Sequence, residues 1–335
     1  MDAFELYERA ATRRTALAGF YNRNVKVETE AGPVLVRIRS AESEPMDLTC
    51  WSEDELLAAI DAYVPAAPRL LHAARNPDFQ IHEYVPGRRV DELAPDGKPL
   101  PDAVLKAVEG FFGTLLRVPA TALPPTPAGW PQDGDTPGFA GLLLELVRAI
   151  RHRGDSAVSD LYEALGVPDD PCHVLMARAH RLARRPFRLL HADIHRKNMI
   201  VAESGHVAFL DWELALWGDP VYDLADHLHK MSCTPGDRRT LTDAWQRSAP
   251  DECCEGWRDD LDFYLGYEAM KSAVVDTVRW GRRIAGTDDA DERRRLCLEL
   301  AAKLTAARPH WKADAPTVTA PGEIEAAVGR CLPRT

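Results

Sequence analysis

Polar side chains with oxygen donors flank two short apolar runs in the middle of the sequence. The runs, residues 199–202 and 207–210, are separated by Glu-Ser-Gly-His, which is a turn sequence. If the runs pair antiparallel, the residues just outside them, Asn198 and Asp211, must lie side by side. An amide oxygen and a carboxylate in that position can share one cation, and Mg²⁺ prefers oxygen ligands. The spacing therefore predicts a magnesium site at the open end of a hairpin.

A second carboxylate precedes this hairpin. Asp193 lies five residues before Asn198 on the entering loop, where it can orient a substrate hydroxyl without binding the metal. The interval equals that of the kinase catalytic loop H-R-D-x-x-x-x-N, and His191 occupies the histidine position. Asp211 takes the place of the aspartate in D-F-G. His195 extends the triplet to HxDxH, but the further ligands that a two-metal hydrolase would need are not evident. The ordered set is specific, whereas a lone HxD triplet is not.

Two segments, HADIHRKN (191–198) and VAFLDWELALWGDPVYDLA (207–225), resemble the signature of the aminoglycoside phosphotransferase and choline kinase-like family. The resemblance implies an α+β, bilobal, protein-kinase-like fold, with a small antiparallel β-sheet N-lobe and a large, mainly helical C-lobe. It implies ATP or GTP as the phosphoryl donor, Mg²⁺ as the cofactor and O-phosphorylation of a small molecule. It also implies Asp193 as the catalytic base and Asn198 and Asp211 as the metal ligands.

Three further residues are expected to support the catalytic loop. His191 is expected to orient the loop by hydrogen bonding. Asp219 and Asp223, in Gly-Asp-Pro-Val-Tyr-Asp-Leu-Ala, are expected to cap helices and brace the loop rather than touch the substrate.

The flanking sequence predicts the elements that position these residues. Residues 20–40 carry two β-type runs and indicate a hairpin. Residues 52–63 begin with a serine cap and acidic residues, which favour a helix, and FQIHEYV indicates a short strand. Beyond that strand the pattern is mainly helical. We therefore expect a nucleotide-binding lobe over residues 1–86, ending in a hinge, and a helical lobe over residues 87–335 that contains the catalytic loop, residues 191–198, and the acceptor-binding helices.

The resemblance also implies a phosphate-binding cation on the third strand. Arg37 falls at this position, where lysine is commoner. Arginine keeps the positive charge but replaces the compact ammonium group of lysine by a planar guanidinium group. Its partner on the following helix is expected to be Glu53, with Glu55 as the fallback.

The remaining nucleotide contacts are expected at two places. The turn that covers the phosphates would run from Gly19 to Asn24, which places Asn22 and Asn24 in the nucleotide site. The strand that ends in HEYVPG resembles the family hinge and would bring His82 and Tyr84 against the purine.

Composition and charge restrict the class of partner. The 335 residues carry a net charge of −11, which argues against nucleic-acid binding. No apolar run approaches the ~20 residues of a membrane span. The seven cysteines form no CxxC pair, so we expect reduced thiols and a cytoplasmic location. We also expect the protein to be a monomer or a homodimer.

One acidic stretch bears on the acceptor. Residues 251–276 hold eight acids against two bases. This excess would favour a polyamine-bearing acceptor, contacted by side chains such as Asp262 and Glu268, although a solvated helix face explains it equally well.

Three functions remain open at this point. The first is a kinase for an antibiotic-like hydroxyl compound, such as an aminoglycoside or a nucleoside, that confers resistance or serves the antibiotic's biosynthesis. The second is a metabolite kinase for choline, a sugar or an amino alcohol, which would share every catalytic residue. The third is a nucleotide-binding pseudokinase. No A-P-E element follows Asp211, so a protein substrate is not expected.

Overall fold

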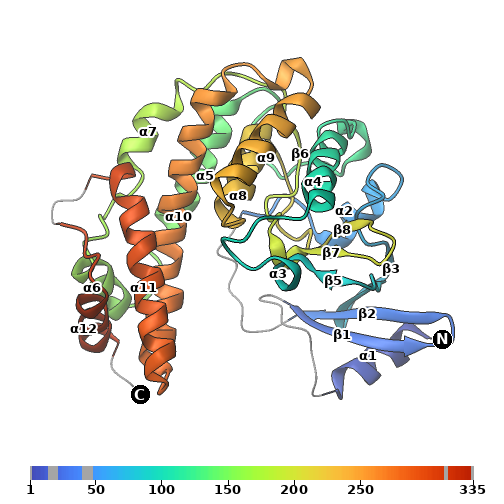
Figure 1. Ribbon diagram of the computed structural model, residues 1–335, viewed down its shortest axis with the longest axis horizontal. Coiled ribbons are helices and arrows are strands. Elements are labelled where there is room, and N and C mark those ends of the chain that lie inside the picture. The colour runs from blue at the N-terminus through green and yellow to red at the C-terminus, as the bar shows by residue number, and fades with distance from the viewer. Residues whose placement is uncertain (1, 14–21, 40–47, 313–315, 333–335) are drawn as a thin grey trace. The chain divides into compact units, whose positions relative to one another are not determined.

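The computed structural model describes residues 2–13, 22–39, 48–312 and 316–332 (Figure 1). The chain forms two compact units, each made of two segments. The first unit joins Met1–Trp130 with Arg188–Asp251, and the second joins Pro131–Phe187 with Glu252–Thr335. The lobe boundary expected at residue 86 lies inside the first unit. No helix within the described ranges is long and apolar enough to cross a membrane.

The first unit contains a four-stranded antiparallel sheet in the order β1-β2-β4-β3. The predicted hairpin is confirmed: Thr29 pairs with Gly32 across a two-residue turn, and Gly32 has a φ of 112°, which glycine adopts readily. The strand predicted at FQIHEYV is also confirmed, whereas the strand before it was not predicted. The strands are β1 (Asn22–Thr29), β2 (Gly32–Arg39), β3 (Leu70–Arg75) and β4 (Asp78–Glu83).

The register gives this sheet one largely polar face. Residues that pair directly across strands share a face, and so do residues two apart along a strand. Arg37 pairs with Asn24 on one side and with Gln80 on the other, while the next row holds Leu35 and His82. The same face therefore carries both the predicted phosphate-binding cation and the end of the predicted hinge strand.

The opposite face is apolar and is covered by α1 (Ala3–Ala11). Val25, Val36 and Ile81 point to this side and form a core with Leu6 and Ala10 of the helix. Helix α1 is thus amphipathic, with Leu6 and Ala10 on its buried side. Because α1 occupies this face, the polar face is the one left for a ligand.

Helix α2 (Glu53–Ile60) follows β2 and confirms the helix predicted over residues 52–63. Leu56, Leu57 and Ile60 are buried and hold it against the rest of the unit. This packing fixes Glu53, the first residue of the helix.

The remainder of the first unit contains the predicted central hairpin, in which Met199 pairs with Phe209. The hairpin is extended by β5, and β6 pairs separately with β9. Helix α8 follows β9 directly. The bounds are β5 (Arg88–Arg89), α3 (Val90–Leu93), α4 (Asp102–Leu115), β6 (Arg188–Leu190), β7 (Met199–Val201), β8 (Val207–Phe209), β9 (Leu216–Gly218), α8 (Pro220–Lys230) and α9 (Pro235–Ser248).

The second unit is helical, as predicted. Its longest element is α10, which contributes nineteen buried residues and runs beside α11 (Figure 1). The bounds are α5 (Thr136–Arg151), α6 (Ser156–Ala164), α7 (His173–Ala179), α10 (Trp257–Gly286), α11 (Ala290–Ala307) and α12 (Pro321–Cys331).

The cover that α1 gives to the sheet leads to a stability prediction. Leu6→Ala removes a side chain that is only 6% exposed, and we expect the unfolding free energy to fall by about 2–5 kcal/mol. Leu71→Ala is the matched control, because Leu71 on β3 is 49% exposed and should change stability by less than about 0.5 kcal/mol. Urea denaturation measures both. Equal losses in the two variants would contradict the packing of α1 on the sheet.

Candidate active site

The carboxylate of Asp193 is held from two sides. Its Oδ1 accepts a hydrogen bond from Nζ of Lys230 at 2.7 Å, and its Oδ2 accepts one from Nδ2 of Asn198 at 2.7 Å. Nε2 of His195 lies 3.5 Å from Oδ2. The side chain remains 17% exposed. Asp193 is therefore fixed in orientation but still open to a ligand.

The surroundings of Asp193 set its charge. Burial would raise its pKa, but the positive charge of Lys230 and the hydrogen bond from His195 outweigh burial and hold the pKa below its usual range. The carboxylate is thus ionised at neutral pH and available as a hydrogen-bond acceptor.

The backbone before Asp193 is strained and is braced by α8. Ala192 has a φ of 57°, in the left-handed region that costs a residue with a Cβ about 1–3 kcal/mol. The carboxylate of Asp223 accepts hydrogen bonds from the backbone N–H groups of Ala192 (2.7 Å) and His191 (3.1 Å). Burial raises the pKa of Asp223 to about 6 despite these bonds. Asp219 caps α8 by accepting from the N–H of Val221 at 3.0 Å.

The side chain of His191 acts differently from the expectation. Its ring is fully buried, and neither ring nitrogen has a hydrogen-bond partner among the described residues. The ring packs instead against Trp212 at 4.6 Å and Phe111 at 5.9 Å between ring centroids. Burial lowers its pKa to about 4, so it is neutral. His191 supports the loop through packing and its backbone N–H, not through hydrogen bonds from its ring.

The hairpin brings Asn198 and Asp211 to the same end of the paired strands. The strands pair from Met199 to Phe209, and the N–H of Leu210 donates to the carbonyl of Asn198 at 2.8 Å. Asp211 has a φ of 68°, a second strained position in the site.

Two oxygens at this end are available for a cation. Nδ2 of Asn198 is used on Asp193, so its Oδ1 faces elsewhere, and Asp211 uses Oδ1 for Arg37. Oδ1 of Asn198 and Oδ2 of Asp211 take no part in these two hydrogen bonds. An amide and a carboxylate oxygen suit Mg²⁺. The described residues contain no cluster of three or more His, Cys, Asp or Glu side chains that could hold a metal. A cation here would therefore need phosphate or water oxygens as well.

Arg37 occupies the centre of a buried charge cluster. Its Nη1 lies 3.2 Å from Oε1 of Glu53, and its Nη2 lies 2.7 Å from Oδ1 of Asp211. Burial would lower the pKa of Arg37, but Glu53 and Asp211 outweigh this and raise it. Glu53, not the exposed Glu55, is the partner on α2. The planar fork of arginine reaches both carboxylates at once, which the single nitrogen of lysine would do less well.

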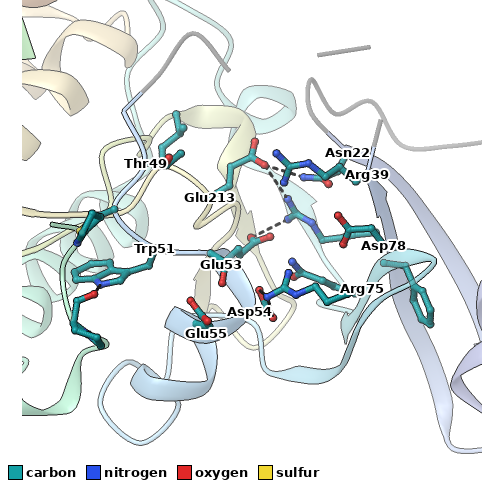
Figure 2. Close-up of a pocket in the computed structure, with 18 residues that line it drawn as sticks. Asn22, Arg39, Thr49, Trp51, Glu53, Asp54, Glu55, Arg75, Asp78 and Glu213 are labelled. Carbon is teal, nitrogen blue, oxygen red and sulfur yellow. Dashed lines mark hydrogen bonds and ion pairs between the residues drawn. The ribbon is translucent and has the colours of Figure 1, made fainter. Parts of the chain in front are cut away.

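Glu213 completes this cluster. Its Oε2 accepts a hydrogen bond from Nδ2 of Asn22 at 2.8 Å and lies 4.0 Å from Nη2 of Arg37. Burial and the neighbouring Asp211 raise the pKa of Glu213 to about 8. Figure 2 shows Glu53 and Glu213 converging from α2 and from the segment after β8. Both residues line a cavity of about 490 Å³.

The other predicted nucleotide residues lie on the same face of the sheet as Arg37 or at its edge. Nε2 of His82 is 2.7 Å from Oε1 of Gln80, and burial, with Arg37, lowers the pKa of His82 to about 3. Oδ1 of Asn24 is buried without a partner among the described residues. Nζ of Lys26 stands 4.7 Å over the ring of Tyr84. Residues 19–21 of the predicted phosphate-covering turn lie outside the described residues.

The two acceptor candidates belong to the second unit and differ in accessibility. Asp262 is exposed on α10. Glu268 is fully buried and forms a 2.8 Å ion pair with Lys271, so the structure gives it a role in packing α10 rather than a surface for a ligand.

Sequence reasoning missed two residues of this site. Glu213 stands two residues after Asp211, so its position in Asp-Trp-Glu was a usable signal. Lys230 was harder to find, because its contact with Asp193 joins residues 37 apart in the chain. The Asp226–Lys230 pair at i,i+4 was its only local sign.

Comparisons with known proteins identify the family of the chain. The model of the phosphotransferase enzyme family matches residues 12–260. No curated protein matches the sequence.

Three similar solved structures share a protein-kinase-like fold. An ethanolamine kinase from Plasmodium vivax is 13% identical, with a TM-score of 0.59 over 88% of this chain and 82% of that one. A choline/ethanolamine kinase family protein from Mesorhizobium loti is 14% identical, with a TM-score of 0.55 over 97% and 98%. A thermostable mutant of aminoglycoside phosphotransferase APH(4)-Ia, in a ternary complex with AMP-PNP and hygromycin B, is 16% identical, with a TM-score of 0.53 over 97% and 95%.

At these identities the likeness establishes the fold, and it confirms the predicted α+β class. The function rests on the family model, which covers well over half of the chain. The protein therefore belongs to the phosphotransferase enzyme family and is a small-molecule phosphotransferase with an alcohol group as its acceptor.

Proposed function

We propose that the protein transfers the γ-phosphoryl group of ATP or GTP to a hydroxyl of an antibiotic-like small molecule, with Asp193 as the catalytic base. Asn198 and Asp211 would hold Mg²⁺, and Arg37 would contact the nucleotide phosphates. The observation that carries the proposal is the β7–β8 hairpin, which gathers Asn198 and Asp211 at one end, with Asp193 hydrogen-bonded to Asn198.

The reaction needs little covalent help from the protein. Asp193 accepts a hydrogen bond from the acceptor hydroxyl and takes its proton as the new P–O bond forms. The bond between the γ-phosphorus and the β–γ bridging oxygen breaks, and the nucleoside diphosphate leaves with that oxygen. A carboxylate of low pKa is a weak base, which suits a loose transition state in which the proton moves late. Positioning then contributes more than basicity.

Two cations would neutralise the negative charge of the nucleotide phosphates. Mg²⁺, when bound, would neutralise developing negative charge on the phosphate oxygens. Arg37 would add a guanidinium whose charge is stabilised by the buried carboxylate of Glu53 and the partly exposed carboxylate of Asp211.

The acceptor is proposed to be a cationic, hydroxyl-rich compound of the aminoglycoside type. Support comes from the net charge of −11 and from five exposed acids within residues 251–276, including Asp262. The other three acids of this stretch are neutralised in ion pairs: Asp260 by Arg185, Glu268 by Lys271 and Asp276 by Lys303. The similarity to a structure that binds hygromycin B points in the same direction. In this role the enzyme would confer resistance or serve biosynthesis.

A metabolite kinase is the second candidate. It is favoured by the similarity to the ethanolamine kinase of Plasmodium vivax and to the choline/ethanolamine kinase family protein of Mesorhizobium loti. Ethanolamine and choline are also cationic, so charge alone does not separate them from an aminoglycoside.

An acceptor panel distinguishes the candidates. The enzyme is incubated with Mg²⁺, ATP or GTP, and hygromycin B, a macrolide, a nucleoside, choline or ethanolamine, and the products are identified by mass spectrometry. We expect one phosphate on hygromycin B or a related aminoglycoside. Phosphate on ethanolamine or choline alone would instead assign a metabolite kinase. Neither transfer nor nucleotide hydrolysis under any condition would indicate a pseudokinase.

The role of Asp193 is tested by Asp193→Asn, which keeps the shape of the side chain but removes its charge. We expect turnover to fall by about 10²–10⁴-fold, because a positioned base is lost. Nucleotide affinity, measured by calorimetry, should be nearly unchanged. Turnover equal to that of the wild type would refute Asp193 as the base.

The role of Asp211 is tested by nucleotide binding rather than by turnover. Asp211→Asn should still bind AMP-PNP in EDTA, but should lose most of the affinity gain that Mg²⁺ gives the wild type, because a charged metal ligand is missing. Fluorescence titration with and without Mg²⁺ provides the comparison and its own control. An undiminished Mg²⁺ effect would exclude Asp211 as a metal ligand.

A further inference from the structure

Lys230 is the last residue of α8, and its ammonium group contacts the catalytic loop. Nζ lies 2.7 Å from Oδ1 of Asp193 and 3.0 Å from the carbonyl oxygen of Ala192. It also lies 2.8 Å from Oδ1 of Asp226, one helical turn earlier, whose side chain is fully buried. The side chain of Lys230 is 23% exposed.

These contacts surround the ammonium group with three oxygen atoms of the protein. An ammonium has three N–H donors and no acceptor. The carboxylate of Asp193 and the carbonyl of Ala192 accept hydrogen bonds from it, and the carboxylate of Asp226 forms an ion pair with it at 2.8 Å. A substrate phosphate would have to compete with all three groups for Lys230. Lys230 is therefore arranged to hold the loop and not to bind the substrate.

Lys230 contacts the loop at the strained residue Ala192 and at the proposed base, Asp193. Ala192 has a left-handed φ of 57°, and its N–H is fixed by Asp223 while its carbonyl is fixed by Lys230. The peptide groups on both sides of this strained residue are thus held by α8. The next residue is Asp193, whose Oδ1 is held by the same ammonium.

We propose that Lys230 is a positioning residue for phosphoryl transfer, which fixes the strained Ala192–Asp193 backbone and the rotamer of Asp193 with one ammonium group. The inference rests on the proposed function, because it takes Asp193 as the group that meets the acceptor hydroxyl. Asn198 fixes Oδ2 of Asp193 from the other side. Without Lys230 the carboxylate would keep its contacts at Oδ2, with Asn198 and His195, but would lose the hydrogen bond at Oδ1 and would rotate away from the reacting position. Asp226 balances the charge of Lys230, so the pair is secured whether or not a ligand is bound.

The test is a double-mutant cycle with Lys230→Met, Asp193→Asn and the double variant. The readouts are the kcat and KM for the hydrolysis of Mg·ATP by water, which needs no identified acceptor, and for transfer to hygromycin B and ethanolamine. We expect Lys230→Met to lower kcat by about 10²-fold, as expected for a misplaced reacting group, with the KM for ATP nearly unchanged. In the Asp193→Asn background, the same substitution should change kcat by less than about threefold, because residues that act as one unit are not additive.

The outcomes separate the inference from the proposed function. Wild-type kcat in Asp193→Asn would overturn the catalytic assignment of Asp193, and the inference with it. Loss of kcat in Asp193→Asn but not in Lys230→Met would overturn the inference alone. So would losses that multiply in the double variant, because Lys230 would then act independently of Asp193.

Two further variants guard against a purely structural effect. Lys303→Met is the matched control, because Lys303 on α11 forms a 2.8 Å ion pair with Asp276 and is 29% exposed, yet lies in the second unit. It should leave the kcat of ATP hydrolysis unchanged, and the change in its melting temperature shows the effect of losing one such ion pair. Lys230→Arg keeps the charge, but the planar guanidinium group spreads its N–H donors over three nitrogen atoms and cannot reproduce the contacts of a single ammonium nitrogen. It should fold and retain a kcat between those of the wild type and Lys230→Met, whereas full activity in this variant would contradict the three-point geometry.

Discussion

One buried guanidinium joins the parts of the candidate site. Arg37 comes from β2, its partner Glu53 begins α2, and its partner Asp211 follows β8. Because Arg37 is only 6% exposed, the loss of either carboxylate would leave a poorly compensated buried charge, which typically costs several kcal/mol. The sheet, the helix and the end of the hairpin are therefore held in one arrangement by charge. Glu213 adds a further carboxylate and links the cluster to Asn22 at the start of β1.

Helix α8 holds the loop that contains Asp193 in place in a similar way. Asp219 caps its first turn, Asp223 binds two N–H groups of the loop, and Lys230 at its end binds Ala192 and Asp193. Positions 223 and 230 are seven apart, about two helical turns, so they share a face of the helix. A rigid helix that contacts the loop at two points can keep Ala192 in its strained conformation and can hold Asp193 in one orientation.

The sequence could predict what depends on local spacing. The interval between the two apolar runs determines which residues flank the hairpin, so Asn198 and Asp211 could be paired without a structure. The helix starting at Glu53 and the β1–β2 hairpin were predicted from local signals as well, although the expected cap is not formed, because the hydroxyl of Ser52 makes no hydrogen bond to the first turn among the described residues. Strand β3 was missed because Leu70–Arg75 consists of leucine, alanine, histidine and arginine and contains no β-branched residue.

What the sequence could not predict depends on tertiary contacts. The apolar surroundings of the His191 ring come from Phe111 and Trp212, which lie far from it in the chain. The contact of Lys230 with Asp193 likewise requires α8 to fold against the loop. The central claim is that the β7–β8 hairpin places Asn198 and Asp211 to share one cation beside Asp193. A crystal structure with Mg²⁺ and AMP-PNP tests it most directly. The account predicts an ion about 2.1 Å from one oxygen of each of these two side chains. An ion coordinated by neither of them would contradict it.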